Sequence, residues 1–178
     1  MLASELAIPE RTLRRAASEG LIHGVRIGPR RLRTTVREQL YLRSHWSLLR
    51  SLRQALRTEP NAQLAVLFGS TARGDDDARS DVDVLVVLAD PSVARLAALA
   101  ERLSARTDRD VQPVRLGDAE SSPLLMADVL EQGRVLVDRE GRWPALRAQR
   151  ERWRRLAASE DRWRLEPMDD LLLGTTAQ

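Results

Sequence analysis

The chain has no cysteine and no lysine, and only two histidines among its 178 residues. Without cysteine, neither a disulfide framework nor a thiolate zinc site can form, and His23 with His45 is too small a set for a zinc centre. No apolar run approaches the length of a transmembrane helix, and the region after Met1 lacks the basic and apolar segments of a signal peptide. These absences predict a cytoplasmic protein. Its 178 residues suffice for one ordinary domain and a small addition.

Positive charge is concentrated at the front of the chain. All 29 basic residues are arginine, and residues 1–57 hold twelve arginines against four glutamates, whereas the net charge of the whole chain is only +3. A basic N-terminal segment followed by an acidic central segment predicts that the N-terminal segment binds a polyanion.

Residues 64–88 hold the groups best suited to chemistry. Short Val- and Leu-rich runs at 64–68 and 82–88 are bounded by Gly and Asp, which predicts two buried strands. Gly69 and Ser70 end the first of these strands. The missing Cβ lets a phosphate approach the backbone there, and the start of the helix expected to follow offers free N–H groups. This turn is therefore a candidate phosphate site.

A pair of carboxylates stands at the head of the second strand. Asp81 and Asp83 are two residues apart, so their side chains point to one face, where they repel each other unless a cation lies between them. Hard oxygen ligands suit Mg²⁺, which usually takes one or two carboxylates and completes its shell with water and substrate phosphates. The acidic run at 75–77 is interpreted as a solvated loop. The alternative is that these residues cap the entrance to a triphosphate site.

The combination of these features is typical of one superfamily. Gly69-Ser70, ten intervening residues and Asp81-Val82-Asp83 running into a strand resemble the signature of the DNA polymerase β-like nucleotidyltransferases, and the wording GSTARG followed by SDVD resembles their minimal, MNT-type branch. The resemblance covers residues 61–140. It implies an α/β (α+β) core in which helices flank a small mixed β-sheet. It also implies that Asp81 and Asp83 bind two Mg²⁺ ions that bridge the phosphates of a nucleoside triphosphate, with ATP as the expected substrate.

The same resemblance assigns roles around this pair. Gly69 and Ser70 would hold the terminal phosphates, and Arg73, one turn into the helix, would add positive charge toward them. The family places a third carboxylate on the strand after the next helix, but the closest match here is Gln112, whose amide cannot act as a base and is a poor metal ligand. Asp110, on the same strand face, is the candidate catalytic substitute, and a solvent-exposed carboxylate at the strand edge is the alternative.

The sequence of the N-terminal residues predicts two short helices, at 2–7 and 10–18, followed by a hairpin or wing at 21–33. This order, with RTLRR in the second helix, resembles the winged helix-turn-helix of MerR-like regulators, although Ala7 stands where the turn often has Gly. The resemblance implies DNA binding through Arg11, Thr12, Arg14 and Arg15 on the recognition helix and through Arg26, Arg30, Arg31 and Arg33 on the wing. The alternative is a basic helical hairpin that packs on its own chain.

A longer helix is expected at 36–57, where Thr35 and Glu38 make a capping box. Its apolar stripe includes His45, which is therefore interpreted as a core histidine and not a ligand. Strands and helices then alternate, which predicts a small sheet covered by helices, and the helix at 144–165 predicts an amphipathic packing element or an RNA- or partner-binding arm. The expected domains are a DNA-binding segment at 1–35, a connecting helix at 36–60, the nucleotidyltransferase domain at 61–140 and a basic helix with a tail at 141–178.

Two functions follow from these patterns. The first is a Mg²⁺-dependent nucleotidyltransferase that moves a nucleoside monophosphate to a hydroxyl group of a protein or tRNA, as family members in toxin–antitoxin modules do to a HEPN-type toxin. The second, favoured by Gln112, is a DNA-binding regulator or antitoxin whose nucleotidyltransferase-like domain is catalytically weak. An antibiotic nucleotidyltransferase is a weaker third reading because it needs a sizeable second domain. A homodimer is compatible with either of the first two.

Overall fold

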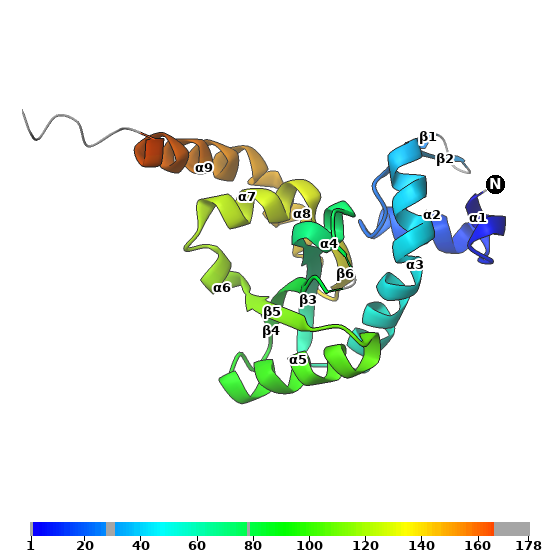
Figure 1. The fold of residues 1–178 in the computed structure, drawn as a ribbon, viewed down its shortest axis with the longest axis horizontal. Coiled ribbons are helices and arrows are strands. Elements are labelled where there is room, and N and C mark those ends of the chain that lie inside the picture. The colour runs from blue at the N-terminus through cyan, green and yellow to red at the C-terminus, as the bar shows by residue number, and fades with distance from the viewer. Residues whose placement is uncertain (1, 28–30, 78, 166–178) are drawn as a thin grey trace, which may run out of the picture.

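The computed structural model describes residues 2–27, 31–77 and 79–165 (Figure 1). Its strands are β1 (Gly24–Ile27), β2 (Arg31–Thr34), β3 (Ala62–Phe68), β4 (Val82–Leu88), β5 (Val111–Arg115) and β6 (Arg134–Asp138). Its helices are α1 (Leu2–Glu5), α2 (Glu10–Ser18), α3 (Val36–Arg57), α4 (Gly69–Arg73), α5 (Val93–Thr107), α6 (Leu116–Ala119), α7 (Pro123–Gln132), α8 (Trp143–Ala148) and α9 (Arg150–Leu165). The expected mixed α+β architecture is confirmed.

The central sheet has the strand order β5-β4-β3-β6. Strand β4 runs parallel to β5 and antiparallel to β3, and β3 runs antiparallel to β6, so the sheet is mixed. In this register Phe68 at the end of β3 lies opposite Asp83, and Asp83 lies beside Gln112 of β5. The end of β3 and the starts of β4 and β5 therefore meet at one edge of the sheet.

Helices cover both faces of the sheet, which explains why β3 and β4 are almost continuously apolar. Successive residues of β3 point to opposite faces. Ala65 and Leu67 belong to a core that includes residues of α3 and α5, whereas Leu64 and Val66 belong to a second core that includes residues of α7 and Trp153 of α9. Figure 1 shows α5 on one side of the sheet and α7 with α9 on the other.

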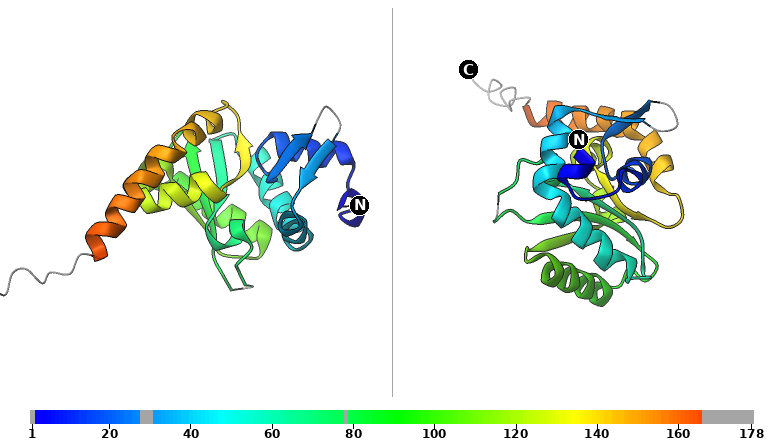
Figure 2. Two further views of the ribbon diagram at one scale, coloured as in Figure 1. Left: turned by 90° about the horizontal axis from the view of Figure 1, so that it is seen from above. Right: turned by 90° about the vertical axis from the view of Figure 1, so that its right-hand side faces the viewer.

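The first helices and the β1–β2 hairpin form one structural group, called here the N-terminal unit (residues 2–27 and 31–34). Figure 2 shows this unit and α9 at opposite ends of the molecule. Leu13 and Ile22 of the unit belong to the same core as Leu42 of α3 and Leu136 of β6, so the unit packs on the rest of the chain. In the turn between α1 and α2, Ala7 takes a φ of 52°, the left-handed conformation that favours glycine. The expected domain boundaries stay a prediction.

Helix α3 begins as expected but lacks a complete capping box. The hydroxyl of Thr35 accepts a hydrogen bond from the backbone N–H of Glu38 at 3.1 Å. The Glu38 side chain, however, is buried and pairs with Arg134. A buried arginine without a carboxylate partner would destabilise the fold more than an incomplete helix cap does. Within the described ranges, no helix combines the length and the apolarity that crossing a membrane requires.

Candidate active site

The turn from β3 into α4 is built around a glycine. Gly69 has a φ of +72°, and a Cβ added there would lie 2.5 Å from Oδ2 of Asp83. Glycine is therefore required both by the backbone conformation and by the close approach of this carboxylate. Gly69 is also the first residue of α4, and in the same helix the Thr71 hydroxyl donates to the backbone carbonyl of Asp81 at 3.2 Å. The Gly-Ser turn and the carboxylate pair are thus brought together.

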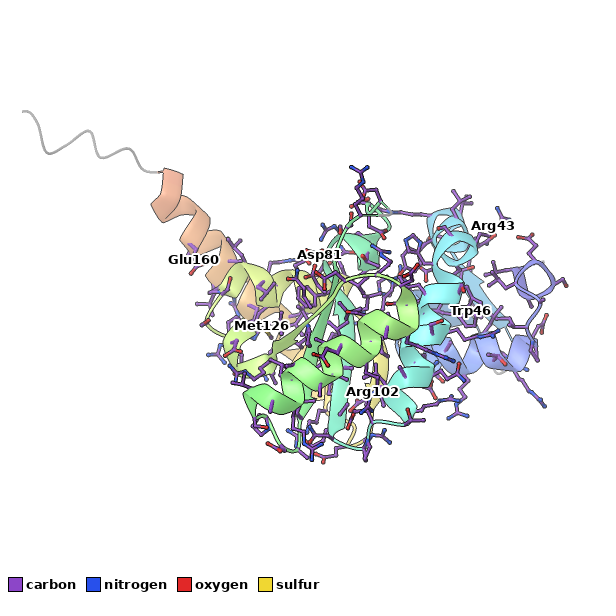
Figure 3. The ribbon with its side chains drawn as sticks, turned by 60° about the horizontal axis from the view of Figure 1, so that its bottom comes forward. Arg43, Trp46, Asp81, Arg102, Met126 and Glu160 are labelled. Carbon is purple, nitrogen blue, oxygen red and sulfur yellow. The ribbon has the colours of Figure 1, made fainter. Side chains whose placement is uncertain are left out.

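Asp81 and Asp83 lie side by side at the start of β4. Asp81 is exposed and Asp83 is half-buried beside the Gly69 backbone. Burial raises the pKa of the Asp83 carboxyl, and the negative charges of Asp81 and Asp128 raise it further, while Arg73 acts in the opposite direction. In the view of Figure 3, Asp81 lies between α7, which carries Met126, and α3, which carries Trp46. Two mutually repelling carboxylates next to the Gly-Ser turn are a donor set that suits Mg²⁺.

The third position of the site is occupied by an amide. Gln112 donates from Nε2 to Oδ2 of Asp81 at 2.7 Å. Asp110 is exposed and its backbone carbonyl accepts from the N–H of Val82, but the structure does not bring its carboxylate to the pair. Among the described residues, no set of three or more His, Cys, Asp or Glu side chains is placed to hold a metal ion. The carboxylate pair with Gln112 is therefore the arrangement that defines the site.

Arg73 is held by two carboxylates in this structure. Its Nη1 donates to Oδ1 and Oδ2 of Asp128 at 3.0 and 3.2 Å, and its Nε donates to Asp75 at 3.2 Å. The Arg73 side chain remains about one-third exposed. Asp128, on α7, was missed by the sequence reasoning, since no motif marks it. It gives Arg73 a resting partner beside the candidate phosphate site.

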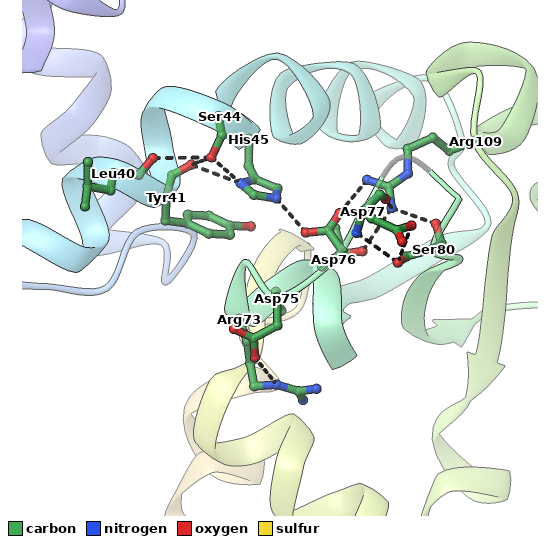
Figure 4. A network of polar contacts seen from close by, with 12 residues as sticks. Leu40, Tyr41, Ser44, His45, Arg73, Asp75, Asp76, Asp77, Ser80 and Arg109 are labelled. Atoms are coloured by element: carbon green, nitrogen blue, oxygen red, sulfur yellow. Dashed lines mark hydrogen bonds and ion pairs between the residues drawn. The ribbon is translucent and has the colours of Figure 1, made fainter.

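The acidic loop before β4 is only partly solvated. The side chain of Asp76 is 4% exposed, and its carboxylate accepts from Nε2 of His45 and from Nη1 of Arg109, each at 2.7 Å (Figure 4). Burial works against the charge of Asp76, but these hydrogen bonds from His45 and Arg109 lower its pKa. The expected solvated loop is therefore wrong for Asp76. The His45 ring stacks on Tyr41 and its side chain is mostly buried, as expected, but its hydrogen bond to Asp76 was not foreseen.

The arginines proposed to contact DNA lie on one short helix. Leu13 and Ala16 of α2 are buried, which leaves the other side of the helix toward solvent. Arg11 and Arg15 are exposed, and Thr12 and Arg14 are partly exposed. Arg15 is paired with Glu19 at 2.7 Å. Of the proposed wing residues, Arg33 is exposed on β2, Arg26 and Arg31 belong to the hairpin strands, and Arg30 lies outside the described residues.

The fold and the site together define a class of protein: a small α+β domain in which paired carboxylates face a Gly-Ser turn. Residues 50–142, more than half of the chain, match the family described as "Polymerase beta, Nucleotidyltransferase". The chain belongs to this family. The match begins inside α3, so the N-terminal unit lies outside it.

The chain is similar to one curated adenylyltransferase and to solved structures of toxin–antitoxin complexes. Over 79 residues it is 39% identical to the protein adenylyltransferase MntA of Shewanella oneidensis, which covers 43% of this chain and 55% of that protein. The chain thus spans about half the length of this relative. A crystal structure of a toxin–antitoxin with AMP-PNP has a TM-score of 0.52 and 28% identity, over 65% of this chain and 94% of that chain. A tri-AMPylated Shewanella oneidensis HEPN toxin in complex with its MNT antitoxin gives a TM-score of 0.50 and 25% identity, over 67% and 94%.

Proposed function

We propose that this chain is a Mg²⁺-dependent adenylyltransferase that moves AMP from ATP to a hydroxyl group of a protein, and that its acceptor is a HEPN-type toxin. The observation that carries the proposal is the facing arrangement of Asp81, Asp83 and the Gly69-Ser70 turn. The likeness to MntA and to the toxin–antitoxin complexes supports the choice of ATP and of the acceptor. A tRNA hydroxyl is the alternative acceptor of the same chemistry.

The reaction joins the acceptor oxygen to the α-phosphorus and breaks the bond to the β-phosphate, so that pyrophosphate and the hydroxyl proton leave. Gly69 lets the phosphates approach the backbone, and Ser70 offers a hydroxyl and an N–H to them. Arg73 can exchange Asp128 for phosphate oxygens, which it binds as a planar fork. Asp81 and Asp83 would hold Mg²⁺, which when bound neutralises the developing negative charge on the phosphates.

The acceptor proton has no dedicated base on β5. Gln112 holds Asp81 by a hydrogen bond from its amide, so Oδ2 of Asp81 is oriented but already accepts one bond. Asp81 and Asp83, the two carboxylates beside the Gly-Ser turn, would both be engaged in holding Mg²⁺, so neither is free to take the acceptor proton. A slow transferase is the expected consequence.

A transfer assay tests this proposal. Each nucleoside triphosphate, labelled at the α-phosphate, is incubated with the protein and Mg²⁺, with a purified HEPN-type toxin or bulk tRNA as the acceptor. Label from ATP alone on the toxin band, absent from the Asp81→Asn/Asp83→Asn variant, is the expected result. Label on tRNA would show that the acceptor hydroxyl group belongs to tRNA and not to a protein. ATP binding without any transfer would refute the proposed transferase activity and would favour a nucleotide-sensing role for the domain.

The exposed arginines of α2 favour a second function, sequence-specific DNA binding by the N-terminal unit. Arginine contacts with phosphates release counterions, so affinity should fall steeply with salt. Polarisation of a labelled duplex from the upstream region of the gene would measure this. The Arg11→Ala/Arg14→Ala variant should lose binding, whereas Arg95→Ala/Arg102→Ala on α5, with the same change in charge, should keep it. An equal loss of DNA affinity in both variants, or binding without sequence preference, would contradict the proposed function as a DNA-binding regulator.

A further inference from the structure

Arg134, the first residue of β6, joins segments that are far apart in the sequence. Its side chain is buried, with 4% exposed. Nη1 and Nη2 donate to the two carboxylate oxygens of Glu38 at 2.7 and 2.9 Å, and Nε donates to the backbone carbonyl of Ala72 at 2.8 Å. The guanidinium carbon lies 3.5 Å from the centre of the Tyr41 ring. One charged group therefore contacts α3 and α4 together.

The contact with Ala72 fixes the end of the helix that follows the Gly-Ser turn. The last carbonyls of a helix lack partners within it, and Arg134 supplies a partner to one of them. The next residue after α4, Gly74, is left-handed with a φ of +80°, and a Cβ added there would come within 3.0 Å of the Tyr41 ring. Arg134 and Tyr41, which stack on each other, thus both lie against the end of α4. Because α4 has only five residues, holding its end also places Ser70 and Arg73.

The same arginine reaches the N-terminal unit. Its Nη1 contacts the backbone carbonyl of Leu21 at 3.4 Å, and Oε1 of Glu38 also accepts from the backbone N–H of His23 at 3.0 Å. The His23 ring is hydrogen-bonded through Nε2 to the carbonyl of Gly133, the residue before Arg134, at 3.2 Å. Docking of the N-terminal unit and placement of α4 therefore depend on one buried ion pair, which tolerates little change in geometry.

We propose that Arg134 is a positioning residue of the nucleotide site, and that through it the docking of the N-terminal unit sets the affinity for nucleotide. The inference rests on the proposed function, since the nucleotide would bind at α4. Leu21, His23, Glu38 and Tyr41 lie outside the range matched by the family, so this connection is additional to the matched domain. By reciprocity, nucleotide bound at α4 stabilises the docked N-terminal unit.

The first test replaces the ion pair by apolar residues of similar length. In Glu38→Met/Arg134→Met both charges are removed together, which often preserves the stability of the fold. Removal of only one partner would leave the other charge buried without a counterion. We expect the Kd for ATP with Mg²⁺, and the KM, to rise by about tenfold or more while the protein keeps a single cooperative thermal transition. The control is Arg139→Met, directly after the end of β6, because Arg139 also donates to backbone carbonyls, those of Ala62 and Leu56, but at the other end of the sheet. It should change the Kd by less than about twofold.

The second test uses the wild-type protein and does not depend on a variant that folds. Hydrogen exchange of the His23 amide, which donates to Glu38, should slow when ATP and Mg²⁺ are added, while exchange of the Arg139 amide, bonded to Gln63 at 2.8 Å, should not change. A folded double variant with the Kd of the wild type, or unchanged exchange at His23 under saturating ATP, would overturn the inference alone. A wild-type protein that binds no nucleotide would overturn the proposed function itself.

Discussion

The side-chain amide of Gln112 donates a hydrogen bond to the carboxylate of Asp81 over 2.7 Å, at the position where the family resemblance expects a third carboxylate. An amide at neutral pH neither takes a proton from a hydroxyl group nor contributes negative charge to a metal site. The bond therefore orients Asp81 without helping to deprotonate the acceptor.

Placing a carboxylate at this position should speed the proposed nucleotidyl transfer. We expect Gln112→Glu to raise kcat by about tenfold or more, because a positioned general base contributes at least this much in enzymes, and to lower the Mg²⁺ concentration needed for half-maximal rate. Single-turnover transfer at saturating ATP, across a Mg²⁺ titration, measures both effects. Gln112→Leu serves as the control that loses the hydrogen bond and gains no base. If Gln112→Glu is no faster than the wild type, a missing base does not limit the rate.

Gly69 should be the glycine whose replacement costs both stability and nucleotide binding. In Gly69→Ala the new Cβ meets Oδ2 of Asp83 at 2.5 Å, and the left-handed backbone adds strain, so we expect about 2 to 4 kcal/mol lower stability and weaker ATP binding. Gly141 separates the two causes, since its φ is +67° but nothing lies within 4 Å of its Cβ position. Gly141→Ala should lose only about 1 kcal/mol and bind ATP normally. Denaturant unfolding and calorimetric titration check both variants; equal losses would mean that strain alone matters.

Local patterns predicted the elements that position the site. The strand at 82–88 and the helices at 10–18 and 36–57 were placed correctly because apolar periodicity, prolines and a capping threonine act within a few residues. The same period of two placed Asp81 and Asp83 together next to the Gly-Ser turn. These features depend on neighbours in the sequence, so the sequence reveals them.

The partners of these residues depend on distant segments and were not predicted. Asp128 is 55 residues from Arg73, and Arg134 is 96 residues from Glu38. Asp76 looks like one member of a solvated acidic run until folding brings His45 and Arg109 to it. A capping box fits Thr35 and Glu38 locally, yet Arg134 takes the Glu38 side chain. A single sequence holds no signal for such pairs, because charge and spacing alone do not say which arginine meets which carboxylate.

Asp76 should stabilise the loop before Asp81 in a pH-dependent way. The pKa of its carboxyl is lower in the folded state than its ordinary value of 3.8, owing to the hydrogen bonds from His45 and Arg109 that outweigh burial. A depressed folded pKa means that the stabilisation is complete above about pH 4 and is lost as the pH falls further. We therefore expect Asp76→Asn to be less stable by on the order of 2 kcal/mol at neutral pH. The difference from the wild type should shrink below about pH 4 in urea unfolding; a constant difference would contradict the ionised contact.

His23 should make the docking of the N-terminal unit sensitive to mild acid. Burial lowers the pKa of its ring below the ordinary value of 6.5, and the neighbouring charge of Arg134 acts in the same direction, although the hydrogen bond to the Gly133 carbonyl opposes them. A histidine whose folded pKa is depressed must gain a proton when the unit opens, so stability is complete above about pH 6.5 and declines as the pH falls toward the folded pKa. We expect hydrogen exchange at the β1–β2 hairpin to accelerate as the pH falls below about 6.5, beyond the intrinsic pH dependence of exchange. In His23→Gln, which keeps an N–H donor and cannot be protonated, this added acceleration should vanish. Persistence of the same acceleration in His23→Gln would assign it to another titrating group.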